Sequence, residues 1–331
     1  MAGHASARSR LILLLILLAA FGLRLYQLGA QSLWYDETVS VHLAGKPVPA
    51  LVAHTAGDIH PPGYYLLLRG WLLLFSYPTG HADPDGHGLE FSAALLSLAF
   101  GMALIPLIYV LGRRLYDEPT ALLAAALTAV SPFHVWYSQE VRMYTLGAAL
   151  GLICLRCAIQ FVSRPAAGVR LVINHQAERA KPAKAGCSQA DHRPLSDQGM
   201  LIVYVLAAAA GLYTLYYFAF LLVALNLWVI VVAGSRFRVP GSKLTQGSTS
   251  DSKPPTSIFH SPSSILCLWF LAQAAVVLLY LPWLPIAWRQ ATNPPVPPWR
   301  TFVGLWNMLL ETWSALSFGQ SVEPVRVWPL L

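Results

Sequence analysis

FSAALLSLAFGMALIPLIYVLG, residues 91–112, contains no acidic or basic side chain. A helix needs about 20 mostly apolar residues to cross the roughly 30 Å of hydrocarbon in a bilayer, and this stretch meets that requirement. It is followed at once by Arg113 and Arg114, which is typical of a span that ends on the cytoplasmic side. The stretch therefore predicts a transmembrane helix, and the apolar runs around it decide how many more there are.

The composition of the whole chain agrees with a membrane protein. Of the 331 residues, 56% are hydrophobic and 11% are charged, and the mean hydropathy is +0.53. Soluble domains usually contain about 45–50% apolar residues. We therefore predict an all-α fold, a polytopic transmembrane helical bundle. The net charge of +7 lies in short segments between apolar runs, which indicates membrane topology and argues against nucleic acid as a partner.

The apolar runs predict seven membrane spans. The run 200–233 would make a helix of about 50 Å at ~1.5 Å per residue, so we expect two helices there with a turn near Tyr213–Tyr217. Arg24 interrupts the first run, and we expect its side chain to reach toward the outer interface. The predicted spans are approximately 11–30, 91–112, 119–137, 143–162, 200–215, 217–234 and 264–288.

The distribution of charge places the connecting segments on two sides of the membrane. Residues 31–90 are richer in acidic than in basic side chains, and we predict that they form an outer loop. The polar segments 163–199 and 235–263 are predicted to be cytoplasmic loops, and the first of them has a basic excess.

This topology requires that the apolar stretch 61–75 does not cross the membrane. The stretch is short for a span, begins with Pro61 and Pro62, and is interrupted by Arg69. We therefore expect interfacial helices in the first outer loop. The chain stops at VWPLL, 327–331, which has the composition of the first turn of a further span, and we expect a chain that is truncated at its C-terminus.

Three polar segments lie on the predicted outer side: WYDE at 34–37, DIHPP at 58–62 and YSQEVRMY at 137–144. Ionisable side chains beside hydrocarbon cost a few kcal/mol unless they are paired or hydrated, so their gathering on one side predicts a polar cavity. A carboxylate such as Asp36 can take the proton of an attacking hydroxyl. Arg142 and His60 can stabilise the negative charge of a departing phosphate.

These residues also allow purely structural interpretations. Asp36 and Glu37 could cap a surface helix that starts at 38, since acidic side chains favour a helix N-terminus. Glu140 and Arg142 could form an outer-loop ion pair that touches no substrate. The tyrosines and tryptophans of these segments could belong to the aromatic belt at the membrane interface.

The sequence contains the motifs RLYQLGAQSLWYDE at 24–37, DIHPPGYYLLL at 58–68, LGRRL at 111–115 and SPFHVWYSQEVRMY at 131–144, with weaker echoes in LYTLYYFA at 212–219 and YLPWLP at 280–285. In this order and spacing, these motifs resemble bacterial membrane glycosyltransferases of the GT-C superfamily. These are relatives of protein O-mannosyltransferases and of lipid A aminoarabinose transferase, the glycosyltransferase 39 type. Members often carry histidine where this chain has Leu215, and they usually continue through further spans.

The resemblance implies an enzyme of the plasma (inner) membrane with its active site on the extracytoplasmic side. The implied donor is a polyprenyl-phosphate-linked sugar, and the acceptor is a lipid, a polysaccharide or a protein. Asp36 is the implied base or acceptor-orienting carboxylate, with Glu37 beside it in the catalytic centre. A divalent metal at this acidic pair is left open. The implied substrate-binding residues are Tyr35, His60, Gln139, Glu140, Arg142 and Tyr144.

Two other functions remain open at this point. A transporter or lipid-handling protein could line a path with the same charges, but it is expected to place ionisable groups near the bilayer midplane. The predicted spans are nearly free of acids, so the sequence favours the transferase. A non-catalytic remnant is the third alternative.

Overall fold

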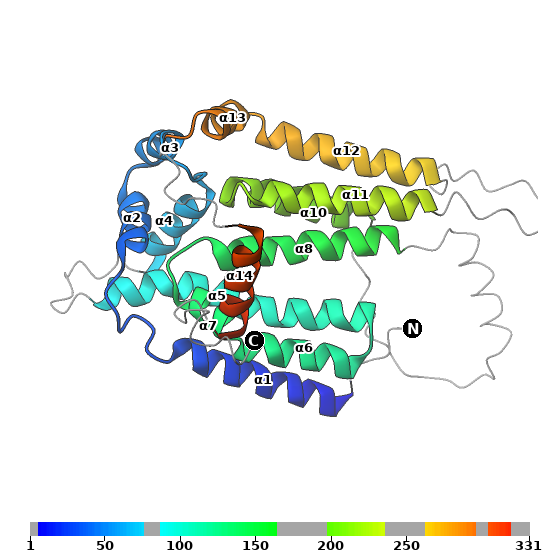
Figure 1. The fold of residues 1–331 in the computed structure, drawn as a ribbon, viewed down its shortest axis with the longest axis horizontal. Coiled ribbons are helices and arrows are strands. Elements are labelled where there is room, and N and C mark those ends of the chain that lie inside the picture. The colour runs from blue at the N-terminus through cyan, green and yellow to red at the C-terminus, as the bar shows by residue number, and fades with distance from the viewer. Residues whose placement is uncertain (1–5, 76–86, 164–196, 236–261, 296–303, 319–331) are drawn as a thin grey trace, which may run out of the picture. The chain divides into compact units, whose positions relative to one another are not determined.

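The computed structural model describes residues 6–75, 87–163, 197–235, 262–295 and 304–318. These residues form α-helices joined by turns and short loops, and no β-strand occurs among them (Figure 1). The predicted all-α fold is therefore confirmed for this part of the chain. The chain divides into two compact units, each of which is described by itself below.

The first unit comprises Met1–Ile153, Ala210–Phe218 and Leu281–Leu331. Within it, α1 packs against α6, α5 packs against α6 and α7, and α2 packs against α4. It also contains the beginning of α8 (Tyr144–Val162). Its other helices are α1 (Ala7–Leu25), α2 (Tyr35–Gly45), α3 (Val48–Ala56), α4 (Gly63–Phe75), α5 (His87–Leu115), α6 (Glu118–Val130), α7 (Pro132–Gln139), α13 (Leu284–Thr292) and α14 (Leu305–Phe318).

The second unit comprises Cys154–Ala209 and Ala219–Tyr280. It contains the rest of α8, most of α10 (Asp197–Thr214) and α11 (Phe218–Ser235), and α12 (Pro262–Tyr280). Polar side chains join its apolar helices. Trp269 Nε1 donates to Asn226 Oδ1 at 2.7 Å, and Asn226 Nδ2 donates to Gln273 Oε1 at 3.3 Å. Interhelical hydrogen bonds of this kind contribute about 1 kcal/mol each in apolar bundles.

Length and composition allow several of the described helices to cross a membrane. α5, over Gly88–Leu115, and α8 each qualify alone, and two bent helix pairs raise the number to four if each pair is one span. The bent pairs are α6 with α7, at 55°, and α12 with α13. Shorter apolar helices are α4, α10 and α11. The protein is thus a multi-pass membrane protein by its apolar helices, whereas the seven predicted spans and their sidedness stay predictions.

The break between α6 and α7 has a local cause. Pro132 follows Ser131, and a residue before proline is pushed out of the helical region into extended backbone. Ser131 has φ −60° and ψ 121°, as this rule requires. The new helix then starts with proline at its first position, where the missing N–H costs nothing.

Arg24 joins α1 to this break. Its side chain is fully buried, so the prediction that it reaches toward the membrane interface is wrong. Nη1 donates to the carbonyl oxygens of Ala20 at 3.2 Å and Ala129 at 2.9 Å, and Nη2 donates to Thr128 O at 3.2 Å. Nε donates to Ser138 Oγ at 3.1 Å. Because the last carbonyls of a helix lack intrahelical partners, Arg24 satisfies the end of α6 and, through Ser138, holds the C-terminal part of α7 beside it.

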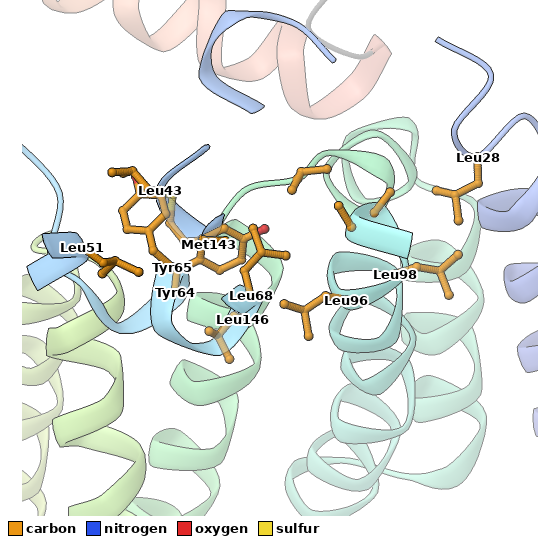
Figure 2. Close-up of a cluster of buried hydrophobic side chains, with 14 residues drawn as sticks. Leu28, Leu43, Leu51, Tyr64, Tyr65, Leu68, Leu96, Leu98, Met143 and Leu146 are labelled. Carbon is orange, nitrogen blue, oxygen red and sulfur yellow. The ribbon is translucent and has the colours of Figure 1, made fainter. Parts of the chain in front are cut away.

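A cluster of buried apolar side chains lies beside the three polar segments of the first unit. Tyr64, Tyr65 and Leu68 of α4 are buried together with Leu96 of α5 and Met143, the residue before α8 (Figure 2). The cluster fixes α4 and the start of α8 relative to α5. The polar residues that precede and flank these elements are thereby held in place.

The first testable consequence concerns Arg24. Arg24→Lys keeps the charge but loses the planar fork that reaches the α6 carbonyls and Ser138 together. We expect a loss of stability of about 2 kcal/mol, since hydrogen bonds to charged groups contribute ~1.5–3 kcal/mol each. Thermal unfolding in detergent measures the loss. Arg8→Lys at the exposed start of α1 is the matched control, and equal midpoints for the two variants would contradict the role of Arg24.

Candidate functional site

The WYDE segment forms the beginning of α2. Trp34 is the residue that precedes the helix, and Asp36 and Glu37 lie in its first turn, where the helix dipole favours negative charge. α2 starts at Tyr35, three residues before the helix at 38 that we considered in the capping interpretation. The acidic pair therefore does stand at a helix N-terminus, and the two carboxylates have different surroundings.

Glu37 is buried, and both of its carboxylate oxygens accept hydrogen bonds from backbone N–H groups. Its side chain is 8% exposed. Oε2 accepts a hydrogen bond from Trp34 N at 3.2 Å, which closes the start of α2. Oε1 accepts one from Val141 N at 2.8 Å, far away in sequence. These contacts favour a positioning role for Glu37, in which it ties α2 to the segment before α8, and its predicted part in catalysis stays untested.

Asp36 is the accessible member of the pair. Its side chain is 38% exposed, and Oδ2 lies 3.6 Å from Nη2 of Arg142. Its backbone oxygen accepts from Arg142 Nη1 at 3.4 Å and from Ser40 Oγ at 2.9 Å. The carboxylate is thus oriented by one cation and remains open to a ligand.

Arg142 is the centre of the cluster. It is 4% exposed. Besides Asp36, its Nη2 contacts Nε2 of His60 at 3.5 Å, and its guanidinium carbon lies 5.8 Å from the ring centroid of Tyr144. The three polar segments of the sequence therefore meet at one guanidinium. Because Arg142 is buried, the geometry favours a role in holding Asp36 and His60, and direct contact with a phosphate stays a prediction.

His60 lies between α3 and α4, directly before Pro61 and Pro62, which restrict the backbone there. Burial, and next the charge of Arg142, lower the pKa of His60, while Asp58 and Asp36 act in the opposite direction. The imidazole is therefore neutral at neutral pH. With Nε2 accepting from Arg142, Nδ1 carries the proton and is a hydrogen-bond donor.

Glu140 adds a second carboxyl group to the cluster. It is 8% exposed, and its Oε2 has no hydrogen-bond partner among the residues that the structure describes. The buried Nε of Arg142 is likewise without one there. Burial, and next the nearby carboxylate of Glu37, raise the pKa of Glu140 to about 7. Glu140 is consequently a mixture of acid and carboxylate at neutral pH.

The remaining predicted residues are placed differently. Gln139 Nε2 donates to the carbonyls of Arg24 at 3.1 Å and Tyr26 at 2.8 Å, so it fixes α7 to the end of α1. Tyr144 is 37% exposed and Tyr35 is 79% exposed, which leaves both rings available to a ligand. Of the predicted residues, the structure thus gathers Asp36, His60, Glu140, Arg142 and Tyr144 around one point and places Gln139 among anchoring contacts.

Tyr65 belongs to the same cluster and was not predicted. It is 1% exposed, and burial raises its pKa to about 12, while the charge of Arg142 acts in the opposite direction. Its position in GYYLLL, where its neighbours in sequence are apolar helix residues, gives no signal that it faces Arg142.

A zinc ion does not fit the acidic pair. Over the described ranges, no group of three or more His, Cys, Asp and Glu side chains lies close enough to hold one. Each carboxylate oxygen of Glu37 already accepts a backbone N–H. Zn²⁺ usually takes three or four such protein ligands, and we derive no metal-dependent step.

Comparison with known proteins supports the resemblance found in the motifs. Residues 59–171 match the family model described as dolichyl-phosphate-mannose-protein mannosyltransferase. The match supports a membrane glycosyltransferase of the GT-C type, and it includes His60 and the segment 137–144. No curated protein and no solved structure matches the chain.

The raised pKa of Glu140 predicts a pH dependence of stability. Between the usual carboxyl pKa of about 4.3 and the folded value of about 7, the folded state binds more protons at this site than the unfolded state. Glu140 therefore reduces stability progressively as pH rises through that window. Glu140→Gln cannot titrate, so its unfolding midpoint should improve relative to wild type from pH 5 to pH 7.5.

Thermal unfolding in detergent at both pH values checks this difference. The comparison between the two proteins cancels the contributions of other groups, including His60, whose lowered pKa acts with the opposite sign. A midpoint difference that stays constant with pH would show that Glu140 has an ordinary pKa.

Proposed function

We propose that this protein transfers a sugar from a polyprenyl-phosphate donor to a hydroxyl group of a lipid, glycan or protein acceptor, on the extracytoplasmic face of the plasma membrane. The observation that supports this most is the meeting of Asp36, His60 and Arg142. The family match covers His60 and Arg142 but begins after Asp36. The structure joins the accessible carboxylate to the matched segment through the 3.6 Å pair with Arg142.

In the proposed reaction, the acceptor hydroxyl oxygen attacks the anomeric carbon of the sugar, and its proton passes to Asp36. The bond between the anomeric carbon and the phosphate oxygen breaks, and polyprenyl phosphate leaves from the opposite face with inversion. General base assistance of this kind contributes about 10²- to 10⁴-fold in rate. Arg142 orients Asp36 for this step and prevents its carboxylate from turning away.

The departing phosphate gains negative charge, which a hydrogen-bond donor in a partly buried site stabilises. His60 supplies Nδ1–H for this purpose, because its Nε2 is turned toward Arg142. The partly exposed ring of Tyr144 and the exposed ring of Tyr35 offer flat surfaces for the sugar. This arrangement separates the base, on α2, from the phosphate contact, on the segment between α3 and α4.

Asp36→Asn tests the catalytic assignment. The amide keeps the shape of the carboxylate but cannot accept the proton, so we expect sugar transfer in membranes to fall about 10²- to 10⁴-fold at equal expression. Thr38→Ala on the exposed side of α2 is the matched control and should transfer at the wild-type rate. Undiminished transfer by Asp36→Asn would remove the carboxylate from the mechanism.

The proposed sidedness has its own test in a chain whose native cysteines are replaced by alanine. Ile59→Cys, at an exposed position beside His60, should react with a membrane-impermeant maleimide in intact cells. Tyr116→Cys, exposed between α5 and α6, should react only after the membrane is permeabilised. The reverse pattern would place the candidate site on the cytoplasmic side.

A further inference from the structure

The segment that carries His60 is held from a second direction by α13. Gln290 is 7% exposed. Its Nε2 donates to the carbonyl oxygens of Thr55 at 2.9 Å and Ala56 at 3.1 Å, and also to that of Asp58. Arg289 Nη2 donates to Ala56 O at 2.6 Å. The last carbonyls of α3 have no partners within their own helix, so α13 supplies them.

The direction of the Gln290 amide is fixed by a relay of donors. Trp283 Nε1 donates to the hydroxyl of Tyr216 at 2.9 Å, and this hydroxyl donates to Gln290 Oε1. Trp283 N–H can only donate, so the Tyr216 oxygen must accept from it and the Tyr216 proton must point to Gln290. The Gln290 NH₂ group is therefore directed at α3. Trp283 and Tyr216 come from the two weakest motifs of the sequence, YLPWLP and LYTLYYFA.

The clamped carbonyls lie two to five residues before His60. Thr55 O also accepts from Asp58 N at 3.2 Å, so Gln290 binds the same turn that sets the direction of the following chain. On the far side of His60, Gly63 lies so close to Tyr213 that a Cβ at 63 would overlap the Tyr213 carbonyl. His60 is thus fixed between contacts on both sides and then meets Arg142.

We propose that Gln290, oriented by Tyr216 and Trp283, is a positioning residue. It holds His60 where Nδ1–H of His60 donates a hydrogen bond to the phosphate of the polyprenyl-phosphate donor. This inference rests on the proposed function. Among the residues that the structure describes, the hydrogen bonds of the Gln290 side chain go to backbone carbonyls of residues 55–58 and to the Tyr216 hydroxyl. Its effect on the donor must therefore pass through His60.

The test uses polyprenyl phosphate as the probe, bound to the full chain in nanodiscs. Gln290→Met keeps the length and volume of the side chain but removes both hydrogen-bonding ends. We expect it to weaken polyprenyl phosphate binding about tenfold in the wild-type background and less than twofold in a His60→Gln background, because the contact it positions is already lost. Thr292→Ala, on the same helix, should bind like wild type.

Hydrogen exchange of the amides of Gly57 and Asp58 gives a readout that does not depend on any ligand. Both amides donate within the clamped turn, to His54 O and Thr55 O, and should exchange faster in Gln290→Met than in wild type or Thr292→Ala. Unchanged exchange would overturn the clamp, and equal weakening in both backgrounds would overturn its action through His60. A wild-type chain that binds no polyprenyl phosphate overturns the proposed function instead, while the exchange rates still decide the clamp.

Discussion

The candidate site depends on one buried guanidinium. Arg142 is 4% exposed, and a cation at such depth is tolerated only where acceptors surround it. Asp36 supplies a carboxylate and a backbone carbonyl, His60 supplies a ring nitrogen, and Tyr144 supplies a ring face. Because these partners come from three separate segments, satisfying the charge of Arg142 also assembles the site.

Other buried polar side chains bind backbone groups at the ends of helices and so also connect separate segments. Arg24 satisfies carbonyls at the end of α6, Glu37 accepts from backbone N–H groups at the start of α2 and before α8, and Gln290 donates to the end of α3. Each of them fills backbone hydrogen-bonding positions that water would fill in a soluble protein. The positions of Asp36 and His60 are therefore fixed by side chains that bind the ends of neighbouring helices. These contacts hold a site that is built on short helices.

The sequence was sufficient for the helical class and for the gathering of the three polar segments, whereas the role of Asp36 as a base stays a prediction. The first two follow from hydropathy, from charge and from short motifs. The sequence could not separate the two acids, because the bond from Val141 N that buries Glu37 joins residues 104 positions apart. Arg24 was misplaced because its acceptors are carbonyls exposed by the Pro132 break, and Gln290 was missed because its partners are also backbone atoms, which leave no trace in residue identity.

The most direct test of the account is to find where a donor lies. A polyprenyl-phosphate sugar with a photoreactive group on the sugar, cross-linked to the wild-type chain in nanodiscs and mapped by mass spectrometry, measures this position. The account predicts adducts in residues 34–37, 58–62 and 137–144 that unlabelled polyprenyl phosphate suppresses. Adducts confined to other segments, or adducts in these segments that the competitor leaves unchanged, would contradict the claim that Asp36, His60 and Arg142 form the donor site.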